Sequence, residues 1–159
     1  MELTLPDEAA TRRVGEALAR TLPDVSRESL LVGLSGELGS GKTTLARGLL
    51  RALGVQGTVR SPTFTLVEPY ETSRGIVHHL DLYRLEPGPG TLEGIGYRDL
   101  RAQPGLVLVE WPERAAGALG TADLQLQMAL EGPGRRISLA AAGESGRSWL
   151  ESTRQLLEE

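Results

Sequence analysis

The chain has 159 residues, of which 40% are apolar and 24% are charged, and its formal net charge is −4. This composition is ordinary for a globular protein, and the negative charge argues against a protein that grips nucleic acid alone over a broad basic face. The absence of cysteine excludes disulfides, thiolate metal sites and cysteine nucleophiles. No apolar run approaches the ~18 residues that cross a membrane, and the N-terminal sequence lacks the pattern of a secretory signal. We therefore expect one cytoplasmic domain over residues 1–159.

The first third of the chain is predicted to alternate strands with helices. Residues 2–5 alternate in polarity and suit a short edge strand. Asp7 is a good helix cap, and the helix that it starts should run to about residue 22, with an apolar residue at every fourth position. Residues 29–36 form an apolar run that suits a buried strand, and residues 42–54 form a second helix that ends at a glycine.

The rest of the chain is predicted to contain two hairpins, a buried strand and further helices. The pattern indicates a hairpin of residues 63–71 and 76–83, a short helix at 91–102 within the Gly/Pro-rich stretch 86–105, a buried strand at 106–110, a helix at 112–119, a hairpin of 123–131 and 135–141, and a terminal helix at 143–159. Strands mixed with helices in this order predict an α/β fold with a mixed parallel and antiparallel central sheet flanked by helices in three layers.

The segment "GELGSGKT" (36–43) matches the phosphate-loop pattern in full and contains the only lysine of the chain. Gly36, Gly39 and Gly41 allow consecutive N–H groups to turn toward one anion, and the following helix adds its positive end. Lys42 is a compact charge that reaches the β- and γ-phosphates, whereas the wide fork of arginine would not fit. The Thr43 hydroxyl suits Mg²⁺. The predicted phosphate contacts are Glu37, Leu38, Gly39, Ser40, Gly41, Lys42, Thr43 and Thr44, and the predicted fold is a P-loop NTPase.

Two acidic residues compete for the Mg²⁺ side of this site. If 76–81 and 106–110 run parallel to the phosphate-loop strand, Asp81 and Glu110 reach the same sheet edge. We expect Glu110 to lie nearer the metal. Asp81 is the alternative, and it could hold Thr43, a metal-bound water or the attacking water. A carboxylate that caps a turn is the plainer interpretation of either residue.

Other residues near this edge have open alternatives. "SPTF" (61–64) could sense the γ-phosphate through Ser61 and Thr63, with Pro62 stiffening the segment, or it could be a simple turn. Arg84 and Arg60 could stabilise phosphate charge or form surface ion pairs. Trp111 could cover the site, present a partner surface or pack in the core.

The two histidines and the choice of base are more constrained. His78 and His79 are adjacent on a strand and must point to opposite faces, so we expect structural roles rather than a shared metal. The chain has no asparagine, and no Asp-x-x-Gly follows the hairpin, which removes the usual elements that read guanine. ATP is therefore the expected nucleotide.

The chain resembles the bacterial TsaE (YjeE) family. "GELGSGKTTLARGLLRALG", "VRSPTFTLVEPY", "HHLDLYRL", "LEGIGYRDL" and "LVLVEWPER" occur in the order and spacing of that family, over roughly residues 6–114. The resemblance implies a P-loop ATPase that uses Mg²⁺ and works with the TsaD and TsaB proteins. That assembly makes N6-threonylcarbamoyladenosine in tRNAs that read codons beginning with A. The family's ATPase is thought to act as a motor or reset device, so contact with tRNA would be indirect.

The resemblance also carries roles to individual positions. Lys42 and Thr43 take the phosphate-loop roles, and Thr63 lies in the switch-like segment. Asp81, Glu110 and Trp111 occupy positions associated with ATP turnover or assembly. An ATP-gated binding module, in which hydrolysis is incidental, is the main alternative function. A small-molecule kinase is disfavoured because the sequence has no long Gly/Arg-rich lid.

Overall fold

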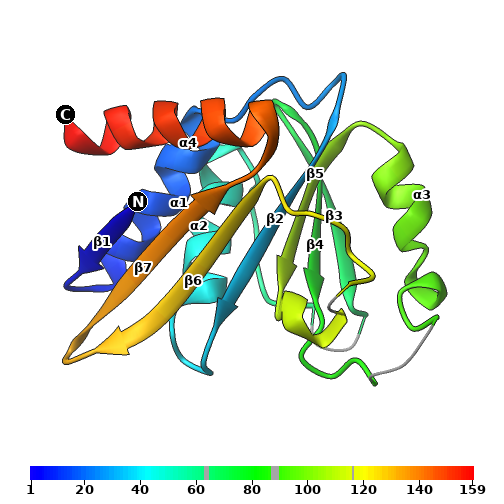
Figure 1. Cartoon of the computed structure of the whole chain (residues 1–159), viewed down its shortest axis with the longest axis horizontal. Coiled ribbons are helices and arrows are strands. Elements are labelled where there is room, and N and C mark those ends of the chain that lie inside the picture. The colour runs from blue at the N-terminus through cyan, green and yellow to red at the C-terminus, as the bar shows by residue number, and fades with distance from the viewer. Residues whose placement is uncertain (63–64, 87–89, 116) are drawn as a thin grey trace.

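The structure is a computed structural model that describes residues 1–62, 65–86, 90–115 and 117–159. Its described part contains a seven-stranded sheet in the order β1-β7-β6-β2-β5-β4-β3 (Figure 1). The strands are β1 (Glu2–Leu5), β2 (Ser29–Gly36), β3 (Val67–Thr72), β4 (Gly75–Asp81), β5 (Gly105–Glu110), β6 (Leu124–Glu131) and β7 (Gly134–Ala141). The helices are α1 (Glu8–Arg20), α2 (Lys42–Ala52), α3 (Tyr97–Ala102) and α4 (Gly143–Glu158), with 3₁₀ turns η1 (Glu93–Ile95) and η2 (Pro112–Ala115).

The centre of the sheet is parallel and its margins are antiparallel. β2 runs parallel to both β5 and β6, and β4 runs parallel to β5. β3 pairs antiparallel with β4, and β7 pairs antiparallel with β6 and β1. The predicted mixed sheet is therefore confirmed. Its register places Glu110 opposite Leu34 on one side and opposite Asp81 on the other, so both acidic residues end at one edge.

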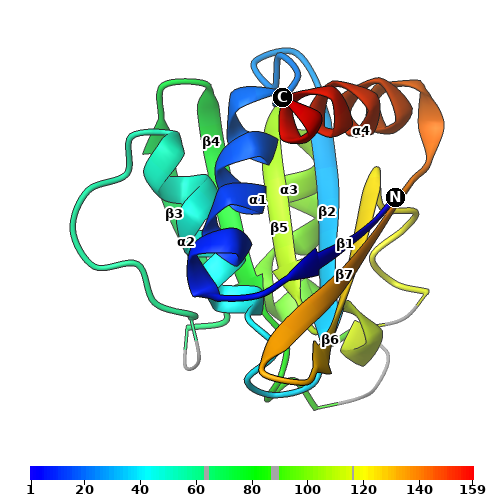
Figure 2. The ribbon, with the colours of Figure 1, turned by 90° about the vertical axis from the view of Figure 1, so that its left-hand side faces the viewer.

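Helices cover the two faces of the sheet unequally. In Figure 2, α1 and α2 lie in front of the sheet and α3 lies behind it, while α4 crosses one end. The main core lies under α1 and α2, where the predicted helix faces are buried: Ala10, Val14, Leu18 and Leu22 of the first and Leu45, Leu49 and Leu53 of the second. On α4, Trp149 is buried and its indole Nε1 donates to Leu18 O at 3.0 Å. Leu150, Leu156 and Leu157 are only half-buried, so the predicted inward face of this helix is narrower than expected.

The position of α2, the helix that follows the predicted phosphate loop, is set by a close glycine contact with α1. A Cβ added at Gly15 would lie 2.2 Å from Leu45 O, and one added at Gly48 would lie 2.6 Å from Arg12 O. Both obstacles are backbone atoms, which cannot rotate away. The two helices therefore approach as closely as they do because these positions lack side chains.

Replacing Gly15 by alanine should lower the free energy of unfolding by about 1–3 kcal/mol, or more, because the helices must move apart. Urea denaturation measures the change. Gly94→Ala is the matched control, since a Cβ there meets nothing within 4 Å and the position has no positive φ. Equal stability of the two variants would contradict the packing argument.

Most predicted boundaries are confirmed within a few residues. Asp7 caps α1 by accepting from Ala10 N at 2.7 Å. The first hairpin is shorter than predicted, because β3 begins at Val67 and β4 ends at Asp81. The predicted strand start at 63–64 lies outside the described residues.

Two helix predictions were wrong. The helix predicted at 112–119 is only the 3₁₀ turn Pro112–Ala115, and Gly117 has a φ of 84°, which a right-handed helix cannot continue through. The helix predicted at 91–102 is divided into η1 and α3 by Gly96, which has a φ of 70°. Across the described ranges, none of the helices has the length and apolar character needed to span a membrane.

Candidate nucleotide site

The predicted site residues gather around one cavity at the edge where β2, β4 and β5 end. The cavity has a volume of about 540 Å³. Among the predicted residues, those lining it are Leu38, Gly39, Gly41, Lys42, Thr43, Thr44, Ser61, Asp81, Arg84, Glu110 and Trp111. Glu37 and Ser40 contact Lys42 instead, Pro62 is buried, and Thr63 lies outside the described residues.

The loop between β2 and α2 has the backbone that an anion cradle needs. Gly39 and Gly41 have φ values of 76° and 104°, in the left-handed region that favours glycine. A Cβ at Gly36 would lie 2.6 Å from Met128 O, so this glycine allows β6 to pass close to the loop. The helix α2 begins directly at Lys42, and its free N–H groups face the cavity end of the loop.

Lys42 is buried and held by the loop itself. Its Nζ donates to Gly36 O at 2.5 Å and to Glu37 O at 2.9 Å, and it lies 3.4 Å from Ser40 Oγ. Burial lowers the pKa of Lys42, and the nearby carboxylates of Glu110, Glu113 and Asp81 partly oppose that shift. The ammonium therefore sits at the cavity wall with only two short hydrogen bonds.

The Thr43 hydroxyl is paired with Glu110. Thr43 Oγ1 donates to Glu110 Oε1 at 2.9 Å, and the Glu110 side chain is almost fully buried. The second oxygen of the carboxylate, Oε2, lies 2.6 Å from His79 Nε2 and 3.3 Å from Ser61 Oγ. The carboxylate is thus fixed on both of its oxygens.

Asp81 has a different set of partners. Its Oδ2 accepts from Ser61 Oγ, and its Oδ1 accepts from Tyr83 N at 3.0 Å. No described contact joins it to Thr43. Of the two candidate acids, Glu110 is the one in contact with the hydroxyl that suits Mg²⁺, and Asp81 anchors the start of "SPTF" and the turn after β4.

Trp111 is half-buried, and it both lies over the lysine and packs against the hydrophobic cluster on the other face of the sheet. Its ring is centred 4.3 Å from Lys42 Nζ and 4.9 Å from the ring of Tyr83. The residue has a φ of 60°, an unusual value for a bulky side chain, and its backbone N donates to Leu34 O at 3.1 Å. The half-buried indole therefore closes one side of the cavity, with its placement fixed by the end of β2.

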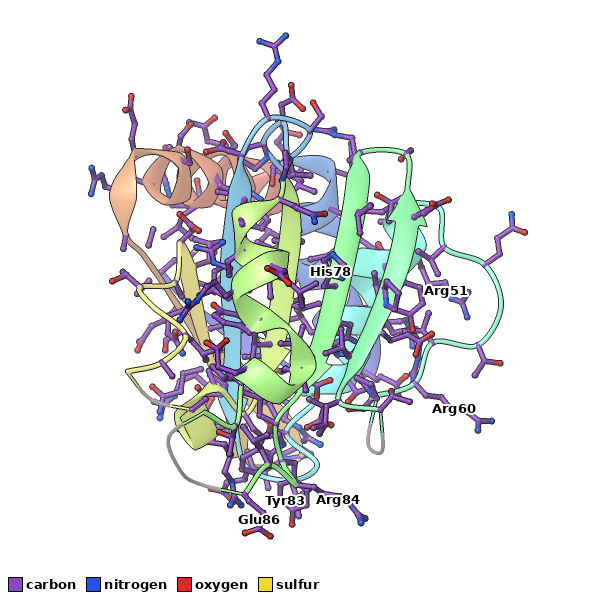
Figure 3. The ribbon with its side chains drawn as sticks, turned by 90° about the vertical axis from the view of Figure 1, so that its right-hand side faces the viewer. Arg51, Arg60, His78, Tyr83, Arg84 and Glu86 are labelled. Atoms are coloured by element: carbon purple, nitrogen blue, oxygen red, sulfur yellow. The ribbon has the colours of Figure 1, made fainter. Side chains whose placement is uncertain are left out.

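The two candidate arginines lie in different places. Figure 3 shows Arg84 beside Tyr83 and Glu86 at the lower end of the strands, where it lines the cavity, and Arg60 on the outer loop with its side chain pointing away from the sheet. A direct role at the phosphates is therefore compatible with the position of Arg84 but not with that of Arg60 in this conformation.

A metal would need ligands beyond the carboxylates. Among the described residues, no group of three or more His, Asp or Glu side chains could hold a metal ion. Mg²⁺ at a nucleotide is typically bound by one or two protein groups, phosphate oxygens and water. The Thr43 hydroxyl and the Glu110 carboxylate, side by side at the cavity, fit that donor set.

Comparison with known proteins identifies the family. Residues 5–137 match the family described as "Threonylcarbamoyl adenosine biosynthesis protein TsaE". The chain belongs to the TsaE family. It is 40% identical to the tRNA threonylcarbamoyladenosine biosynthesis protein TsaE of Haemophilus influenzae over 91% of each chain, and 42% identical to that of Aquifex aeolicus over 71% of this chain and 77% of the relative. The resemblance predicted from the motifs is confirmed.

Structural similarity agrees with this assignment at the level of the fold. The crystal structure of YdiB from Bacillus subtilis matches with a TM-score of 0.79 and 23% identity, and the match covers 98% of this chain and 95% of that one. As a TsaE protein, the chain is a protein of threonylcarbamoyladenosine biosynthesis in tRNA.

Two contacts of this TsaE site were missed by the sequence analysis. His79 has no exposed surface and lies against Glu110, whereas His78 is half-buried on the opposite face, where burial lowers its pKa. The opposite faces were predicted correctly. Side chains alternate along a strand, so His79 lies on the same face of β4 as Asp81. This alternation is the sequence signal that could have predicted the contact of His79 with Glu110. Arg135 of β7 donates to Ser40 O at 3.1 Å and Gly39 O at 2.9 Å, and only the strand order brings it there.

Proposed function

We propose that this protein is a P-loop ATPase that binds and hydrolyses ATP with Mg²⁺. In this proposal it serves the formation of N6-threonylcarbamoyladenosine in tRNAs that read codons beginning with A. It would act on a TsaD–TsaB pair in the cytoplasm and meet the tRNA only through that complex, and residues 1–159 would form a single P-loop ATPase domain. The observation that carries the proposal is the pairing of Thr43 with Glu110 beside the buried Lys42.

The residues present fit a bound nucleotide triphosphate. The turned loop at Gly39 and Gly41, together with the start of α2, supplies backbone N–H groups for phosphate oxygens. Lys42 donates two hydrogen bonds to loop carbonyls and can direct its remaining proton toward a phosphate in place of Ser40 Oγ. Thr43 and Glu110 would hold Mg²⁺, which neutralises phosphate charge when it is bound.

Asp81 is assigned to the attacking water. It is a mostly buried carboxylate that lines the cavity, and it contacts Ser61 rather than Thr43. Because Ser61 touches both Asp81 and Glu110, the start of "SPTF" would respond to a change at either acid. We propose that this segment, including Thr63, is the switch. Arg84 and Trp111 at the cavity mouth would then report the nucleotide state to the partner proteins.

Phosphate release from ATP tests the proposal. We expect slow release by the protein alone with Mg²⁺, and an increase of about tenfold or more when TsaD, TsaB and tRNA are added, since catalysis that depends on positioning is strongly affected by a closing partner. A protein that binds no ATP, or whose turnover is unchanged by the complete set of partners, would overturn the corresponding part of the proposal. Phosphate transfer to an added metabolite without release would instead indicate a kinase.

A further inference from the structure

His79 is placed to control the orientation of the Glu110 carboxylate. The imidazole Nε2 lies 2.6 Å from Glu110 Oε2, and both side chains are almost completely shielded from solvent. The two residues come from neighbouring parallel strands, β4 and β5, and their side chains lie on the face covered by α1 and α2. A contact this short between fully buried groups is fixed by the sheet and does not depend on a mobile loop.

The hydrogen-bonding pattern assigns the proton of the imidazole. The carboxylate is surrounded by donors, because Thr43 Oγ1 lies at Oε1 and Ser61 Oγ lies at Oε2. His79 Nε2 therefore donates, and Glu110 accepts. His79 Nδ1 is buried and, within the part of the chain that the structure describes, has no hydrogen-bond partner. A proton on Nδ1 would be left unpaired, so the tautomer with hydrogen on Nε2 is favoured.

We propose that His79 is a positioning residue for the metal side of the site. By holding Oε2, it keeps Oε1 turned toward Thr43 and the cavity, where Mg²⁺ would be bound under the proposed function on which this inference rests. Ser61 cannot replace it, since its contact with Oε2 is longer, at 3.3 Å, and the same hydroxyl also pairs with Asp81. In this arrangement His79 would not touch the metal, but its hydrogen bond would orient the carboxylate that binds it.

The tautomer is measured first, on the unmodified protein. Nitrogen-15 NMR of the imidazole should show hydrogen on Nε2 of His79. Hydrogen on Nδ1 alone would overturn the inference, because Nε2 could not then donate to Glu110. This measurement needs no substitution, so it decides this step even if a variant of the buried residue fails to fold.

Substitution then tests the positioning role. His79→Leu removes the donor and keeps an apolar volume, whereas His79→Gln places an amide N–H near the position of Nε2. We expect His79→Leu to raise the Mg²⁺ concentration needed for half-maximal tightening of ATP binding by about tenfold or more, and His79→Gln to restore most of the loss. Binding of ATP in excess EDTA should change little in either variant.

His78→Leu is the matched control, since His78 is the adjacent histidine on the opposite face of the same strand and has no described contact with Glu110. It should leave the Mg²⁺ dependence unchanged. If His79→Leu lowers the melting temperature but keeps the wild-type Mg²⁺ dependence, His79 is only a packing residue and the inference fails. If the wild-type protein itself shows no Mg²⁺-dependent ATP binding, the proposed function fails first, and the two failures are distinguished.

Discussion

Replacing Lys42 by alanine is expected to weaken ATP binding by a hundredfold or more and to abolish measurable hydrolysis. Lys42 is the only lysine of the chain, and its Nζ is held at the cavity wall by Gly36 O and Glu37 O. Under the proposed function, the remaining proton of Lys42 would form a hydrogen bond between charged groups with a phosphate, which would contribute about 1.5–3 kcal/mol beside the attraction of its charge, and about 1.4 kcal/mol corresponds to a tenfold change. Calorimetric titration with ATP measures the affinity, and phosphate release measures the turnover.

Lys42→Arg tests whether the positive charge alone is enough at this position, and Arg154→Ala is the control for loss of a cation elsewhere. Lys42→Arg keeps the charge, but a planar fork cannot occupy the narrow space between the loop carbonyls and Trp111, so it should rescue little. Arg154→Ala removes a cation of α4 that pairs with Glu151 and Glu158 and does not line the cavity, and it should not change binding. Normal turnover by Lys42→Ala would exclude a phosphate-loop mechanism.

The sequence predicted the placement of the candidate residues at one sheet edge where local chemistry and strand order act together. The phosphate-loop pattern predicted a glycine turn between a strand and a helix that begins at Lys42, and the structure has this turn between β2 and α2. β5 pairs parallel with both β2 and β4, and this pairing brings Asp81 and Glu110 to one edge without any distance being known in advance. The convergence was therefore predictable from topology alone.

The parts that were not predicted depend on long-range packing. The close approach of α1 and α2 at Gly15 has no signal in helix propensity, which disfavours glycine inside a helix. The contact of Arg135 with the loop requires β6 to insert between β2 and β7. The helix expected after Pro112 stops early because Gly117 adopts a positive φ, which the apolar spacing does not reveal.

Replacing Glu110 by glutamine is expected to lower hydrolysis by a hundredfold or more while ATP binding falls only a few-fold. Glutamine keeps the length and shape of the side chain, but it removes the charge that Mg²⁺ prefers in an oxygen ligand. Its amide oxygen must face His79 Nε2, which leaves the NH₂ group pointing at Thr43 Oγ1, the hydroxyl that the metal would need. Rapid-quench hydrolysis with a parallel binding titration separates the two effects.

Glu113→Gln is the matched control, since this carboxylate is also close enough to affect Lys42 but is exposed and contacts Ser35 Oγ at 3.3 Å. It should change hydrolysis less than threefold.

Asp81→Asn should also slow hydrolysis, but without shifting the Mg²⁺ dependence, because Asp81 contacts Ser61 and Tyr83 rather than Thr43. A reversed result, in which Asp81→Asn shifts the Mg²⁺ dependence and Glu110→Gln does not, would move the metal to Asp81. Continued tRNA modification over many cycles by a Glu110→Gln protein that binds ATP without cleaving it would replace the motor with an ATP-gated binding module.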